Sequence, residues 1–225
     1  MSRPDKRWYV RGMAGGAAAL LLAGCGSGDS GGDSAVKALG KAEVASVLPD
    51  AKAVPGWRTQ LKPEARARNP ELPPPPCVTT SKKEHGTACD PVTFWGASAY
   101  VRESDAASLN FWTLAYKDEK TAGAAYDALA DYYGGDRVGV GAKPVPIGEP
   151  GQERVSNRAD TGTMGGPASI TQIRVGTTVL GVSTGTTQGT AALSDDQVKA
   201  LAAMFAERAR QAQDGDRPSA ALPGR

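Results

Sequence analysis

The sequence predicts an α+β domain, in which an antiparallel sheet of about five to six strands is flanked by helices and a long helix lies at the C-terminal end. Three helical patterns, with apolar residues recurring at every third or fourth position, occur at 34–48, 118–135 and 194–212. Between them lie short runs rich in aromatic and β-branched residues, which come in adjacent pairs. Paired strands form antiparallel hairpins and do not alternate with single helices, so the class is α+β and not α/β.

The first 24 residues have the pattern of a secretory signal peptide. Basic residues precede the weakly apolar run MAGGAAALLLAG, which is too short to cross a bilayer because a spanning helix needs about 20 residues. The following Leu22-Ala23-Gly24-Cys25 resembles the lipobox of bacterial lipoproteins. This resemblance implies cleavage before Cys25 and a diacylglycerol group on its sulfur, with the protein anchored to the cell membrane by lipid on the extracytoplasmic face. The alternative is an ordinary signal peptide followed by a chance cysteine.

The chain is expected to hold one folded domain, at 35–213. Residues 26–34 consist only of Gly, Ser and Asp and predict a flexible tether after Cys25, and the composition of 214–225 predicts a disordered tail.

Four basic residues and one acid in the signal peptide carry +3 of the formal charge, so the +2 of the whole chain becomes −1 once they are removed. No basic surface then argues for nucleic acid as a partner.

Each predicted helix has a plausible start signal. Ser34 and Asp118 are suitable N-cap residues for the first two, and Ser194 with Gln197 has the spacing of a capping box for the third. Pro49 follows the first helix closely and predicts its end.

Two hairpins and one further strand are predicted between the helices. The runs 91–104 and 108–117 form the first hairpin, and 170–184 forms the second with its turn at Gly176. A weaker strand pattern lies at 152–158.

The two remaining cysteines are expected to pair. With Cys25 committed to lipid, Cys77 and Cys89 form an even pair in an oxidising compartment, which predicts a disulfide. A metal site is the alternative, because His85 lies between them in the pattern C-x7-H-x3-C. Zinc sites use close-spaced ligand pairs that this stretch lacks, so we expect no metal and place His85 in an exposed loop.

The order of these parts resembles that of actinobacterial exported lipoproteins and, more distantly, the PknH-like extracellular sensor domain of mycobacterial serine/threonine protein kinases. The resemblance is carried by Leu48-Pro49, Pro55-Gly56-Trp57, the turn IGEPGQE and the run IRVGTTVLGV. It implies an antiparallel sheet flanked by helices, a cleft for an unknown ligand and bracing disulfides. The chain departs from that family in its single expected disulfide and in a lipid anchor in place of a spanning helix and kinase.

The sequence does not indicate an enzyme or a cofactor. A Ser-His-Asp arrangement would have to use His85, and no G-x-S-x-G elbow accompanies it. The pattern S-x-x-K at 34–37 lacks the partner motifs of penicillin-binding enzymes. Asp127 and Asp131 are spaced to share a solvated helix face, and GTMGGP lacks the Lys-Ser/Thr of a phosphate loop.

Binding is therefore the expected role. Four aromatic residues on the first hairpin could line a concave sheet for a lipid, glycan or peptide, or could fill the core; they are Trp95, Tyr100, Trp112 and Tyr116. Trp57 is expected to be a packing residue. Two functions follow: a non-catalytic sensor or binding module for a cell-envelope ligand or partner protein, and a carrier of lipid or another apolar molecule.

Overall fold

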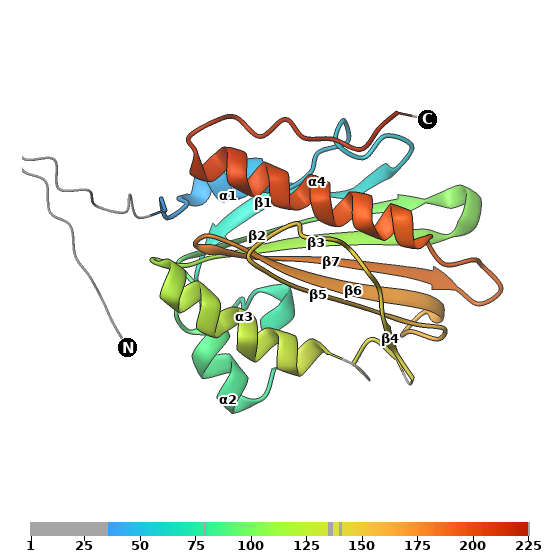
Figure 1. Cartoon of the computed structure of the whole chain (residues 1–225), viewed down its shortest axis with the longest axis horizontal. Helices are drawn as coiled ribbons and strands as arrows, with labels where there is room; N and C mark the ends of the chain where they lie inside the picture. Colours follow the sequence, from blue (N-terminus) through green and yellow to red (C-terminus); the bar gives the residue numbers. More distant parts are fainter. Residues whose placement is uncertain (1–35, 79, 135–136, 140, 225) are drawn as a thin grey trace, which may run out of the picture. The chain divides into compact units, whose positions relative to one another are not determined.

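The computed structural model (Figure 1) describes residues 36–224 except 79, 135–136 and 140. The signal peptide, Cys25 and the tether predicted for 26–34 lie outside the described residues. The strands and helices below belong to one compact unit, Ser34–Arg225. No helix in the described part combines the length and the apolar composition needed to cross a membrane.

The domain is built on one antiparallel sheet of seven strands, in the order β1-β2-β3-β7-β6-β5-β4. Both predicted hairpins are present, as β2–β3 and β6–β7, and the two hairpins join at the centre through β3 and β7. The predicted α+β class is confirmed, but the sheet has more strands than the five to six expected. The strands are β1 Arg58–Ala67, β2 Phe94–Arg102, β3 Ala107–Ala115, β4 Lys143–Pro144, β5 Glu153–Ala159, β6 Gly165–Val175 and β7 Thr178–Thr187.

The unpredicted strand β1 lies at one edge of the sheet and pairs only with β2. Its sequence, RTQLKPEARA, is charged and contains Pro63, so it lacks the alternating pattern of a strand. The pairing is interrupted by register shifts on both sides of Leu61. Charge, proline and irregular register are features that protect an edge strand from pairing with another chain.

Helices cover both faces of the sheet (Figure 1). The core beneath α1 (Lys41–Val47) and α4 (Asp195–Gln213) includes Leu109, Phe111 and Leu180, whereas α3 (Glu119–Tyr133) packs on Leu114 and Val179. On each strand the residues of the first group are an odd number of positions from those of the second, as Phe111 is from Leu114. Because side chains alternate along a strand, the two groups lie on opposite faces of the sheet.

Helix α1 is shorter than the helix predicted for 34–48. It begins after Gly40, whose backbone is extended (ψ 179°). A glycine inside a helix costs about 1 kcal/mol relative to alanine, so the chain starts the helix after this residue.

Helix α4 carries the predicted capping box and a buried arginine. The Ser194 hydroxyl accepts from the backbone N–H of Gln197, and the Gln197 side chain accepts from the N–H of Ser194. Arg208 is only 6% exposed, and burial lowers its pKa. Its guanidinium donates to the carbonyls of Ser46 (2.8 Å), Val47 (2.9 Å) and Leu48 (3.2 Å), which end α1 without helical partners.

The segment predicted as a disordered tail is ordered up to Gly224. The chain turns at Gly215 (φ +87°), and Arg208 donates to the carbonyl of Ala220 (3.0 Å). Further along, the N–H of Leu222 donates to the carbonyl of Ala53 (2.8 Å). Composition alone predicted disorder, but polar side chains of α4 and a backbone partner hold this segment against the domain.

The predicted disulfide between Cys77 and Cys89 is present, with the two Cα atoms 5.9 Å apart. It joins the last residue of the helical turn η1 (Pro75–Cys77) to the end of η2 (His85–Cys89), and the loop that it closes also contains α2 (Lys82–Glu84). For a loop of this length the chain-entropy argument gives a stabilisation of about 3 kcal/mol. Because both sulfurs are paired, neither is a thiolate that could bind zinc.

His85 lies in a helical turn and not in the loop expected for it. Its Nδ1 lies 3.3 Å from the Thr80 hydroxyl, and its Nε2 lies 3.8 Å from Asp90.

Candidate ligand-binding groove on the sheet

Part of the sheet face that carries α3 is hollowed by two adjoining cavities, of about 340 and 180 Å³. They share Asn110, Ile170 and Ser183, and we call the combined space the sheet groove. Its floor crosses β2, β3, β7 and β6 and consists mainly of small residues, namely Ala97, Ala99, Ser183, Gly185 and Ala168. These small side chains, on β2, β7 and β6, leave this part of the sheet hollow.

Trp112 is the large side chain of the floor. Its residue is 8% exposed and lines the larger cavity. The indole ring lies directly against Gly181 on β7, because a Cβ atom built at residue 181 would lie only 1.9 Å from Trp112 Cε2. A side chain at 181 and the present position of the ring are therefore mutually exclusive.

The walls of the sheet groove are largely apolar. At one side Pro75 and Pro76 meet Tyr133 at the end of α3, and the Tyr133 hydroxyl donates to the Pro76 carbonyl (2.6 Å). The disulfide at Cys77 fixes the same turn. The lining residues Leu61 and Met164 are 43% and 48% exposed, so large apolar side chains face solvent at the groove.

Polar groups lie at the centre and at one end of the sheet groove. Asn110 and Ser183 are directly opposite each other on β3 and β7, and both line the two cavities. An asparagine amide offers both donors and an acceptor, and a serine hydroxyl does the same. Arg137 lines the smaller cavity and stacks on Tyr132, with its guanidinium carbon 4.4 Å from the ring centroid. Among the described lining residues there is no carboxylate, so the local charge favours neutral or anionic ligands.

The structure separates the four aromatic residues that the sequence analysis grouped together. Trp112 lines the groove, whereas Trp95 lies on the same face outside it, with Arg66 stacked at 5.9 Å from its ring centroid. Tyr100 lies on the opposite face beneath α1 and is fully buried, with its hydroxyl donating to the Pro49 carbonyl (2.5 Å).

Tyr116 is also fully buried. Its hydroxyl donates to the carbonyl of Ala88 (2.7 Å) in η2, and burial raises the pKa of this phenol. Tyr100 and Tyr116 are thus core residues with no surface left for a ligand. Trp57, expected as a packing residue, is partly buried against the core beneath α4.

The other groove residues were not identified from the sequence. Asn110, Ser183 and Arg137 belong to no motif, and their grouping depends on which part of the sheet α3 leaves uncovered. One feature of the sequence could have indicated the groove floor. A glycine inside a strand, such as Gly181, often marks a place where another group approaches the backbone closely, and here that group is the Trp112 ring.

No family model and no curated protein matches the chain. Among solved structures, it is similar to the crystal structure of the extracellular domain of PknH from Mycobacterium tuberculosis. The match has 11% sequence identity and a TM-score of 0.51, and covers 80% of this chain and 99% of that chain. At this level of identity the likeness establishes the fold alone. The resemblance predicted from the sequence is confirmed to that extent: the chain has the fold of the PknH extracellular domain.

Proposed function

We propose that the protein is a non-catalytic sensor or binding module on the extracytoplasmic face of the cell membrane, and that it holds a cell-envelope ligand in the sheet groove. The observation that carries this proposal is the floor of small residues around Trp112, since concave sites with apolar walls and a few polar groups are the usual form of ligand pockets. The fold shared with an extracellular domain supports the location.

The groove's residue types support binding over catalysis. Ser108 and Ser183 provide hydroxyls, but the lining residues that the structure describes include neither a histidine nor a carboxylate to act as a base. The mixture of Trp112, Asn110 and Arg137 suits a ligand with one apolar face and several hydrogen-bonding groups.

A lipid carrier is the second candidate, and exposed Leu61 and Met164 on the groove favour it. A carrier needs a continuous apolar cavity, whereas Asn110 and Ser183 place polar groups at the centre of this one. We therefore favour the sensor or binding module.

Native mass spectrometry of protein purified from a related bacterial host tests the site. We expect a co-purified or added envelope component, either glycan or peptide, to bind the unmodified protein. Ser183→Phe should weaken that binding at least tenfold, because a phenyl ring would occupy the centre of the groove. Thr187→Phe, at the exposed end of the same strand, is the matched control. Equal binding by the Ser183→Phe variant would rule out the sheet groove as the site, and a bound diacyl lipid would favour the carrier.

The proposed membrane anchor has its own test. Cys25→Ser should move the protein from the membrane fraction to the soluble fraction of fractionated cells, because a serine hydroxyl cannot receive the diacylglycerol that cysteine does. Ser30→Ala, in the predicted tether, should leave the distribution unchanged. Retention of the Cys25→Ser variant in the membrane fraction at the wild-type level would contradict the lipid anchor.

A further inference from the structure

One buried side chain at the border of the sheet groove has no hydrogen-bond partner. Gln172, on β6, is 1% exposed, and neither its amide nitrogen nor its amide oxygen bonds to any other residue that the structure describes. A buried amide is normally paired, because burial removes it from the water that would otherwise bond to it. An unpaired glutamine in the middle of a central strand therefore calls for a reason beyond packing.

The register of the sheet places Gln172 at the edge of the groove. Trp112, Gly181 and Gln172 are directly opposite one another on β3, β7 and β6. Residues two positions away on a strand share its face. On one side of Gln172, Ile170 lines both cavities of the groove, and on the other side Arg174 lies beside α3. Gln172 is therefore the last covered side chain on this face of β6 before the groove begins.

The ring of Trp112 screens Gln172 from the groove. Trp112 lines the larger cavity, and its indole lies over Gly181, the direct neighbour of Gln172 across the sheet. The ring thus occupies the space through which a ligand in the groove would reach the amide. Because residue 181 has no side chain, this space is open to a ligand once the ring has turned away.

The chemistry of Gln172 selects another amide as its partner. A primary amide has two N–H donors and a carbonyl acceptor. A secondary amide matches both, because its carbonyl accepts from the glutamine nitrogen and its N–H donates to the glutamine oxygen.

The rest of the groove favours a sugar as the carrier of that amide. An extended peptide is recognised mainly through main-chain bonds at a free strand edge, whereas β2, β3, β7 and β6 are paired with one another along the groove floor. The floor instead offers the Asn110 amide, the Ser183 hydroxyl and the Trp112 ring. Side-chain donors and acceptors suit the hydroxyls of a sugar, and an aromatic face suits its apolar C–H groups.

We propose that Gln172 determines the ligand specificity of the sheet groove, and that its amide pairs with the acetamido group of an N-acetylated sugar once the Trp112 ring has turned away from Gly181. The sugar ring then lies in the groove, with its hydroxyls at Asn110 and Ser183. This inference rests on the proposed function, because it names the ligand chemistry of the same groove.

Isothermal titration calorimetry with N,N′-diacetylchitobiose tests the proposal, and cellobiose, with hydroxyls in place of the acetamido groups, is the comparison ligand. The wild-type protein should bind diacetylchitobiose at one saturable site and cellobiose at least tenfold more weakly. Gln172→Leu should reduce the affinity for diacetylchitobiose to that for cellobiose, because leucine is similar in size but forms no hydrogen bond. Gln188→Leu, at an exposed position just after β7, is the matched control and should bind normally.

Two further measurements separate recognition from folding. The melting temperature of Gln172→Leu should equal or exceed that of the wild type, because the change removes an unpaired amide from a buried position. In protein labelled with 5-fluorotryptophan, the fluorine resonance of Trp112 should shift when diacetylchitobiose binds, whereas that of Trp57 should not. The Trp112 resonance is assigned with Trp112→Phe.

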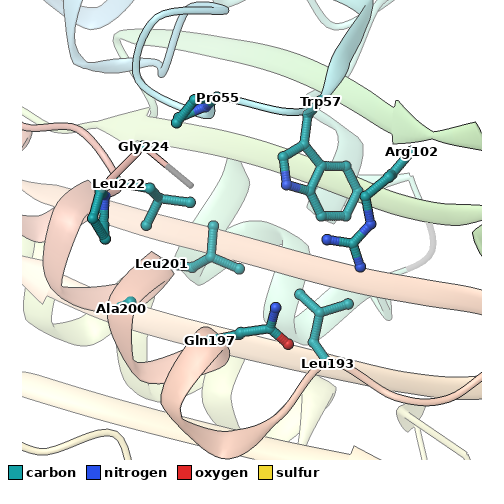
Figure 2. A pocket seen from close by; sticks show the side chains of 10 residues that line it. Pro55, Trp57, Arg102, Leu193, Gln197, Ala200, Leu201, Leu222 and Gly224 are labelled. Carbon is teal, nitrogen blue, oxygen red and sulfur yellow. The ribbon is translucent and has the colours of Figure 1, made fainter. Parts of the chain in front are cut away.

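A second pocket, of about 210 Å³, lies beside α4 and provides a control for location (Figure 2). None of its lining residues belongs to the sheet groove. Figure 2 shows the side chains of Leu201 and Leu222 next to each other, with the Trp57 indole across from them. Ala200→Leu adds three carbons to the wall of this pocket and should leave the binding of diacetylchitobiose unchanged.

Failure of this inference and failure of the proposed function give different results. Binding of diacetylchitobiose that is lost in Ser183→Phe but unchanged in folded Gln172→Leu would overturn the role of Gln172 and keep the groove as the site. Binding that is lost in Ala200→Leu and kept in Ser183→Phe would overturn both. Absence of saturable diacetylchitobiose binding by the wild-type protein, or tighter binding of an N-acetylated alanine tripeptide, would overturn the sugar as ligand and not the groove.

Discussion

Replacing Arg208 by methionine is expected to lower the free energy of unfolding by about 3–5 kcal/mol. Methionine keeps much of the buried hydrocarbon but donates no hydrogen bond. It would leave four buried or half-buried carbonyls without their donor, those of Ser46, Val47, Leu48 and Ala220. The end of α1 and the C-terminal segment should both loosen, because one guanidinium holds them together.

Chemical denaturation followed by circular dichroism measures this effect. Arg210→Met is the matched control on the same helix, since Arg210 is 43% exposed and donates to one backbone carbonyl, that of Pro150 (2.8 Å). We expect the control to cost about 1 kcal/mol or less. If the two variants lose the same free energy of unfolding, the claim that Arg208 holds the end of α1 and the C-terminal segment together is wrong.

Gly181→Ala is expected to destabilise the domain by about 2–3 kcal/mol and to reshape the sheet groove. The added Cβ would lie 1.9 Å from Trp112 Cε2, a separation that atoms in contact cannot adopt. Either the indole moves into the groove or the central strands β3 and β7 separate. A ligand bound in the sheet groove should therefore be lost together with the stability.

Gly185→Ala is the matched control, because it lies on the same strand and the same face. A Cβ atom there would lie 3.2 Å from Sδ of Met164, a flexible side chain that can move aside. We expect a loss within about 0.5 kcal/mol for this variant. A double-mutant cycle sharpens the comparison: Gly181→Ala should cost much less when Trp112 has already been replaced by valine. Additive losses would contradict the contact between residues 181 and 112.

The sequence predicted those parts of the fold whose signals are local. The capping box at Ser194 and the apolar spacing of α3 and α4 depend on neighbours within one or two helical turns, and both are present. Strand β1 was missed because its position at the edge, with only one paired neighbour, permits charged residues and Pro63. Its strand conformation is imposed by pairing with β2, which the segment itself does not encode.

The candidate site was less predictable than the fold. Trp112 was identified from its aromatic character, but Trp95 and Tyr100 are five positions apart on β2 and so face opposite sides of the sheet. Residues on the same face of the sheet are buried in the core where α3 covers them and line the groove where it does not. The extent of this cover depends on how α3 packs on the sheet, which the local sequence does not indicate. The C-terminal segment shows the same limit, because Arg208 lies on α4 while the backbone it orders lies beyond the helix.

The join between the two hairpins at the middle of the sheet has a consequence for folding. Each hairpin pairs two strands that are neighbours in the sequence, whereas β3 and β7 pair directly although α3, β4, β5 and β6 separate them along the chain. Closing so long a loop is the slow step expected for long-range strand pairing. Until it closes, the inner edges of both hairpins are open to pairing with a second copy, so aggregation competes with folding at this stage. In the folded sheet these two edges are paired with each other. The edge strands are then β4, which is two residues long, and β1, which is charged and irregular in register.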